Sequence, residues 1–234
     1  MLLPVLSTKR VDDMERCDEG VRSDVVEALS RDSRFNSARI TVTVVSGRAI
    51  LRGDARTLYT IRIAGELAAT VRGVISVDNE LRVSRDAACP DDAVIELLAE
   101  QILKYNASIG ADRVRVAVGA GTVTLRGQVD AYWKRLRAES LMLDIQGVVG
   151  VNNELAVVPE LVPQDAVIAD DVKSAIERSA CPGQNSISVK VDHGLVTLTG
   201  SVPSLLSKKI TPHLAESILG VKGVIDNLVV AARD

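Results

Sequence analysis

The sequence predicts an α+β protein made of three tandem αββαβ modules, each a three-stranded mixed sheet with two helices on it. Three observations lead to this prediction. A glycine-centred block that reads as two strands occurs three times, a second glycine-led block follows each occurrence at the same distance, and helical patterns lie before the first block and between the two. Internal repetition of this kind indicates a repeated architecture.

The first repeated block is a predicted β-hairpin. It runs over residues 40–53 and recurs over 114–127 and 187–200. In the first copy Ile40, Val42 and Val44 alternate with threonines, which is typical of a half-buried strand. The inward face continues at Ala49 and Leu51, Val123 and Leu125, and Val196 and Leu198.

Glycines recur at two positions of this block. They lie in the turn at Gly47, Gly121 and Gly194, and at the end of the block at Gly53, Gly127 and Gly200. A glycine in the turn permits the positive φ that a tight hairpin requires, so we expect these glycines to be structural.

The second repeated block begins 20 residues after the last glycine of the first. It starts at Gly73, Gly147 and Gly220, and the sixth residue after each is Asn79, Asn153 or Asp226. Corresponding glycines are 74 and then 73 residues apart, as at positions 47, 121 and 194. We expect the leading glycines to end helices and the asparagines to bond local backbone. A helical crossover before this third strand predicts that it runs parallel to the second strand.

Two helices are predicted in each module. Aliphatic residues four apart indicate the first helix, at Val21, Val25 and Leu29, at Val94, Leu98 and Ile102, and at Ile168, Val172 and Ile176. Asp91 or Asp92, and Asp165, stand where N-caps are expected. The second helix occupies the 20-residue gap, with Tyr59, Ala64, Leu67 and Val71 matched by Trp133, Ala138, Leu141 and Ile145 and by Leu206, Thr211, Leu214 and Ile218. Pro212 should break or restart the last helix, with Thr211 as a cap.

These patterns predict the domain boundaries. Residues 1–19 form an N-terminal extension, and the modules cover 20–83, 91–158 and 164–231. The linkers, 84–90 and 159–163, are short and contain prolines, so adjacent modules should have limited freedom.

Composition excludes several classes of protein. The net charge of −3 gives no overall field that would attract nucleic acid or an anionic membrane. Cys17, Cys89 and Cys181 form no Cys-x-x-Cys pair, so we expect reduced thiols, no disulfide framework and no zinc site. No run approaches the roughly 18 apolar residues of a membrane span. The apolar run at residues 1–6 is too short for the hydrophobic region of a signal peptide. As written, the chain is expected to be cytoplasmic, or periplasmic if the start codon is misassigned.

The two blocks together resemble the BON domain, named for bacterial osmotically induced and nodulation proteins. The resemblance rests on the hairpin glycine, hydrophobic-x-Leu-x-Gly, a helix and Gly-Val-x-x-Val-x-Asn-x-Leu, and three copies cover nearly the whole chain. Copy three departs from the pattern at Asp226 and Pro212. The resemblance implies a bacterial, noncatalytic module that binds phospholipid or mediates protein contacts, often in envelope-stress and osmotic-shock proteins.

The best membrane-contact candidate surrounds the only tryptophan. Trp133 stands beside Lys134, Arg135 and Arg137, and an indole with neighbouring cations suits the headgroup region of an anionic bilayer. The alternative is a structural role, because Trp133 takes a repeat position that points to the core and a basic helix face is usually only solvated.

Catalysis and RNA binding find little support in the residues. His193 in a hairpin turn and His213 beside Pro212 have no partner that the sequence reveals, so we expect no enzyme. A KH-type RNA module has the same order of elements, and G-x-x-G occurs over 147–150 and 220–223. Those loops hold a single basic residue, Lys222, which argues against RNA.

The sequence therefore predicts a noncatalytic bacterial scaffold that contacts phospholipid surfaces or partner proteins in an envelope or osmotic stress context. The alternative is a cytoplasmic stress protein that binds a small solute or an ion between modules. We expect no cofactor, no metal ion and no nucleic-acid partner, and the sequence indicates no oligomeric state.

Overall fold

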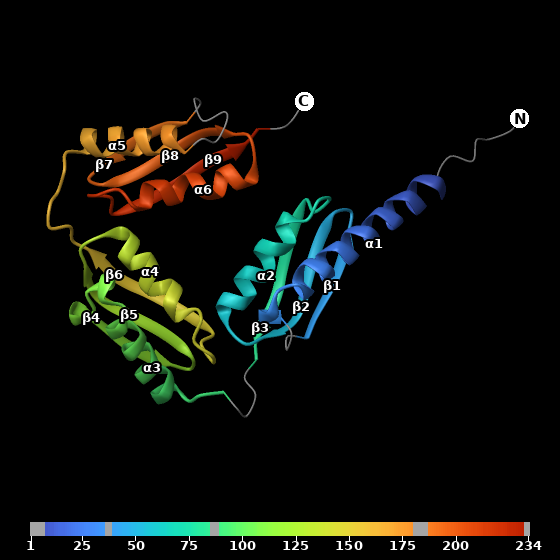
Figure 1. Cartoon of the computed structure of the whole chain (residues 1–234), viewed down its shortest axis with the longest axis horizontal. Coiled ribbons are helices and arrows are strands. Elements are labelled where there is room, and N and C mark those ends of the chain that lie inside the picture. The colour runs from blue at the N-terminus through green and yellow to red at the C-terminus, as the bar shows by residue number, and fades with distance from the viewer. Residues whose placement is uncertain (1–7, 36–38, 85–88, 180–186, 232–234) are drawn as a thin grey trace, which may run out of the picture. The chain divides into compact units, whose positions relative to one another are not determined.

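The computed structural model describes the whole chain except residues 1–7, 36–38, 85–88, 180–186 and 232–234. It contains three separate three-stranded sheets, and each sheet carries its own pair of α-helices (Figure 1). The predicted α+β fold with three repeated modules is confirmed.

Module 1 shows the topology most fully. Its elements are α1 (Thr8–Ser30), the 3₁₀ turn η1 (Ser33–Phe35), β1 (Arg39–Val45), β2 (Arg48–Ala55), α2 (Leu58–Thr70) and β3 (Ser76–Val83). Strand β2 is central, antiparallel to β1 and parallel to β3, and it pairs with β3 from Arg48↔Ser76 to Ala55↔Val83. The predicted parallel third strand is confirmed.

Modules 2 and 3 repeat this order. Module 2 consists of α3 (Asp92–Tyr105), η2 (Ala107–Ile109), η3 (Ala111–Arg113), β4 (Val114–Gly119), β5 (Thr122–Val129), α4 (Tyr132–Met142) and β6 (Gly150–Val157). Module 3 consists of α5 (Asp165–Arg178), β7 (Ser188–Asp192), β8 (Leu195–Val202), α6 (Leu205–Glu216) and β9 (Gly223–Val230).

Both helices of a module cover the same face of its sheet. In module 1, Val25 and Leu29 of α1 and Ala64 and Ala68 of α2 join Leu51 of β2 in one buried cluster. Module 3 builds the same cluster from Ile168, Val172, Ile176, Ala215, Val196, Leu198 and Leu228. The alanines let the second helix approach the sheet closely, so a core poor in aromatic side chains can still be densely packed.

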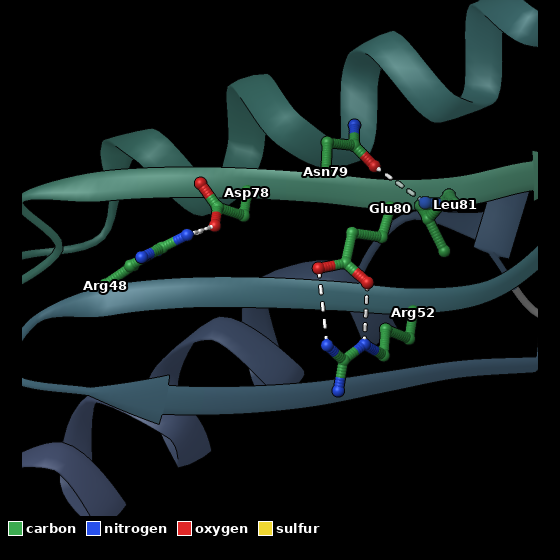
Figure 2. Close-up of polar contacts among 6 residues, drawn as sticks. All are labelled: Arg48, Arg52, Asp78, Asn79, Glu80 and Leu81. Atoms are coloured by element: carbon green, nitrogen blue, oxygen red, sulfur yellow. Dashed lines mark hydrogen bonds and ion pairs between the residues drawn. The ribbon is translucent and has the colours of Figure 1, made fainter.

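The opposite face of the first sheet is charged. Arg48 and Arg52 on β2 form ion pairs with Asp78 and Glu80 on β3 (Figure 2). The hydrogen bonds from Arg52 hold the pKa of Glu80 below its ordinary value. Cross-strand pairs of opposite charge stabilise the sheet modestly and keep this face in water.

The predicted core stripe of α3 is wrong by one residue. Val94 and Leu98 are 44% and 38% exposed, whereas Ile95, Ala99 and Leu103 are buried. Four-residue spacing fits both rows, because α3 carries aliphatic residues on two adjacent stripes. The 74-residue step from Val21, Val25 and Leu29 selects the row that the structure buries.

The expected break at Pro212 is also wrong. Helix α6 continues through Pro212, and Thr211 lies inside the helix rather than capping it. Ser204 is the N-cap instead, and its side chain accepts a hydrogen bond from the Ser207 backbone N–H. Thr211 and Ala215, on either side of the proline, are fully buried, so core packing offsets the roughly 3 kcal/mol cost of an internal proline.

The second helices are shorter than the predicted 20-residue gap. They end at Thr70, Met142 and Glu216, so Val71, Ile145 and Ile218 lie beyond the helices in the turns that lead to the last strands. Ile145 is nevertheless buried, which explains why its spacing reads as part of the helix.

Gly53 is required by a close approach between two strands. A Cβ atom at Gly53 would lie 1.8 Å from the carbonyl oxygen of Arg39. The same approach occurs in module 2, where a Cβ atom at Gly127 would lie 1.9 Å from the carbonyl oxygen of Arg113. Both glycines have φ near +127°, a conformation that other residues rarely adopt, so no larger residue fits here.

Candidate functional site

An aspartate holds the hairpin turn in every module. Asp18 of α1 accepts hydrogen bonds from the backbone N–H groups of Ser46 at 2.6 Å and Gly47 at 3.0 Å. Asp92 binds Ala120 and Gly121 in the same way, at 2.7 and 2.8 Å, and Asp165 binds His193 and Gly194 at 2.8 and 2.9 Å. Both central residues of each turn have positive φ, as in a type I′ hairpin. We call this contact the turn clamp.

One predicted helix cap is confirmed, because Asp91 directly precedes α3 and its side chain accepts a backbone N–H of the first turn, and the other, at Asp165, is wrong. Asp165 is the first residue of α5, and the N-cap is Gln164. At α3, Asp91 accepts the Val94 N–H while Asp92 holds the turn. Sequence reasoning missed the clamp, although each aspartate precedes its turn glycine by 29 residues, as the pairs 18 and 47, 92 and 121, and 165 and 194 show. This constant spacing in all three copies could have predicted the turn clamp from the sequence.

The repeated asparagine joins the last strand to the second helix. Asn79 accepts a hydrogen bond from the Leu81 N–H (Figure 2) and donates its amide N–H to the carbonyl of Ile61 in α2, at 2.6 Å. Asn153 makes the matching contact with the carbonyl of Arg135 at 2.9 Å. The predicted bond to local backbone is confirmed, whereas the bond to the second helix was not predicted. Asp226 keeps the local bond, to the Leu228 N–H, but has no amide N–H to donate.

The four membrane-contact candidates lie on α4, but they are not equally available. Trp133 is 38% exposed, and Arg137 is exposed. Lys134 lies 2.7 Å from a carboxylate oxygen of Asp130 and has only 18% of its side chain exposed. Arg135 donates to the carbonyl of Asn153 at 3.1 Å. Trp133 and Arg137 are therefore the two exposed members, although the Lys134 ammonium also lies 5.7 Å from the centre of the Trp133 ring.

Lys134 also borders a hollow of about 200 Å³ in module 2. The hollow is lined by residues of η2 and η3, by the end of β5, by the start of α4 and by the segment after β6. The buried side chains of Ile109 and Val129 contribute apolar surface, and the other lining side chains are mostly charged. No pattern in the sequence indicates this hollow, because its residues come from three stretches that are distant along the chain, 109–113, 128–134 and 158–160.

Both histidines contact carboxylates. His193 Nδ1 lies 2.7 Å from Asp192, and His213 Nδ1 lies 2.8 Å from Glu216. Asp165, Asp192 and His193 bring one ligand atom each within 4.8 Å of one another, a separation that a metal ion could bridge. The His193 and Asp192 side chains are 93% and 76% exposed, and Asp165 already serves the turn clamp, so the group is a poorly shielded metal candidate.

The cysteine and membrane-span predictions are tested only in part. Cys89 is half-buried and free, whereas the Cys17 side chain and Cys181 lie outside the described residues. Among the residues that the structure describes, no helix is both long and apolar enough to cross a bilayer.

The fold and these contacts define a class of protein: tandem αββαβ modules, each closed by a turn clamp. Family comparison agrees with this class, since the BON domain model matches residues 18–85, 91–159 and 164–232. The chain belongs to the BON domain family. The resemblance seen in the sequence is thereby confirmed.

Three relatives from bacteria align with well over half of the chain. The 21 kDa hemolysin of Actinobacillus pleuropneumoniae is 29% identical over 145 residues, which are 60% of this chain and 73% of the relative. The outer membrane lipoprotein DolP of Haemophilus influenzae is 30% identical, with 58% and 72% covered. The osmotically-inducible protein Y of Escherichia coli is 28% identical, with 59% and 71% covered.

Proposed function

We propose that this chain is a noncatalytic scaffold of the bacterial envelope, and that module 2 contacts anionic phospholipid through α4. The observation that carries the proposal is the exposure of Trp133 on the same helix as the exposed Arg137. An indole at the headgroup boundary with a cation beside it is a favourable arrangement at a membrane surface. The names of two relatives, an outer membrane lipoprotein and an osmotically-inducible protein, support an envelope or osmotic stress context.

The contacts of Lys134 and Arg135 determine how this proposal should be tested. Alanine at either position would remove a contact to Asp130 or to the Asn153 carbonyl, so lost lipid binding could reflect a disturbed module. The informative variant is therefore Trp133→Ala with Arg137→Ala. Its control is Tyr59→Ala with Arg62→Ala, which removes one aromatic ring and one arginine from α2 of module 1 together with the contacts that Tyr59 makes to Arg34, so it also shows whether a disturbed module by itself lowers binding.

The experiment is co-sedimentation with vesicles of phosphatidylglycerol and with vesicles of neutral phosphatidylcholine. We expect salt-sensitive binding to the anionic vesicles alone, a loss in the α4 double variant and unchanged binding in the α2 double variant. Binding that both variants retain would refute the α4 assignment. If no vesicle sediments the wild-type chain, phospholipid contact is wrong, and a partner protein becomes the object of the search.

A further inference from the structure

The hollow of about 200 Å³ in module 2 has a composition that selects a ligand class. Its charged lining consists of two cations, Arg113 and Lys134, and three carboxylates, Asp112, Asp130 and Glu160. Gln128 adds an uncharged amide. The buried Ile109 and Val129 supply the apolar part. A site of this size accommodates only a small molecule, because drug-sized ligands occupy sites of roughly 300–1,000 Å³.

One ion pair already lies within the lining, and its Asp130 Oδ1 atom is buried without a hydrogen bond. The Lys134 ammonium lies 2.7 and 2.8 Å from the two carboxylate oxygens of Asp130, and the Lys134 side chain is only 18% exposed. This pair neutralises one charge of each sign. It is therefore part of the wall of the hollow rather than a free recognition group.

The remaining charges are one guanidinium and two carboxylates. Arg113, Asp112 and Glu160 are exposed, and within the described part of the chain we find no ion pair or side-chain hydrogen bond for any of them. A guanidinium binds a carboxylate through two parallel N–H···O bonds, and carboxylates bind an ammonium group. A molecule that carries both a carboxylate and an ammonium group would satisfy both signs of charge at once.

We propose that this hollow binds a small free zwitterion of the α-amino acid type. Its carboxylate is held by Arg113, and its ammonium group is held by Asp112 and Glu160. Gln128 donates or accepts a further hydrogen bond, and the apolar wall meets the ligand's carbon atoms. This proposal is independent of phospholipid contact through Trp133 and Arg137.

The Asp130–Lys134 wall is specific to module 2. The 74-residue step places Arg56 and Thr60 at these positions in module 1, and the 73-residue step places Pro203 and Ser207 there in module 3. Neither pair can form an ion pair between a carboxylate and an ammonium group. The wall of the hollow therefore differs between module 2 and the other two modules.

The test is titration of the full chain with glycine, followed by two-dimensional amide NMR. We expect saturable shifts at the amides around the hollow, Gly110 and Gln128 among them, and no saturation with acetate or with methylammonium at the same concentrations. Arg113→Ala should raise the Kd for glycine at least tenfold, and so should Asp112→Asn combined with Glu160→Gln. Arg115→Ala and Glu100→Gln, exposed charges outside the lining, should leave the Kd unchanged.

The ammonium carboxylate could also come from the headgroup of phosphatidylserine. Vesicles of phosphatidylserine and of phosphatidylglycerol separate the two sources. Shifts with free glycine that Arg113→Ala abolishes support the proposal, whatever the vesicles do. Vesicle binding that prefers phosphatidylserine, with no response to free glycine, contradicts it. Equal shifts with glycine and acetate also contradict it, because the site would then read a carboxylate alone.

Discussion

The turn clamp of module 1 allows a quantitative prediction. Asp18→Ala removes two hydrogen bonds from one carboxylate to the Ser46 and Gly47 backbone N–H groups. Ser46 is exposed, so water can replace part of the interaction, and we take about 1 kcal/mol for each bond. The variant should lose about 2 kcal/mol of the free energy of unfolding of the module. For a domain of this size, that loss lowers the Tm by about 8–16 °C.

Asp18 suits this measurement because α1 begins ten residues earlier, at Thr8, so the loss of a favourable charge at a helix N-terminus contributes little. The assays are calorimetry and amide hydrogen exchange of Ser46 and Gly47. The matched control is Asp24→Ala, an exposed aspartate on the same helix, which should change stability by less than about 0.5 kcal/mol. Unchanged exchange of the two turn amides in Asp18→Ala, or an equal effect of Asp24→Ala, would show that the clamp does not stabilise the hairpin.

Three further predictions concern two positions at which one module differs from the others, and one ion pair of module 1. Asp226→Asn should stabilise module 3 by about 1 kcal/mol in urea denaturation, because the new side-chain amide can donate a hydrogen bond to the Lys208 carbonyl. Pro212, four residues later, has no backbone N–H to donate to that carbonyl. Ala131→Ser should raise the unfolding midpoint of module 2 by adding the missing N-cap of α4, a gain of about 1 kcal/mol; an unchanged midpoint would refute the comparison with the capped helices α2 and α6. The Arg34 guanidinium hydrogen-bonds Asp32 and lowers the pKa of that carboxyl to about 2. The depressed pKa means that the pair contributes stability above the ordinary value of 3.8 and loses it as pH falls towards 2, so carboxyl NMR titration of Arg34→Ala should return the Asp32 pKa towards 3.8.

The sequence by itself determined the number of modules, the order of their elements and the direction of the third strand. These features follow from local rules: alternation predicts a strand, glycine permits the turn, and a helical crossover makes the next strand parallel. The repeat made each rule testable three times within one chain. It also contained the correct buried stripe of α3, which single-copy spacing misassigned to Val94 and Leu98.

Only the tertiary structure decided which side chains meet. The contact between Asp18 and its turn closes over 28 and 29 residues, and that between Asn79 and the Ile61 carbonyl closes over 18. The structure likewise shows that Lys134 is ion-paired with Asp130 whereas its sequence neighbour Trp133 is exposed. Local preference specifies the backbone of each element, whereas the partner of a polar side chain depends on how distant elements pack, and packing is a property of the assembled module.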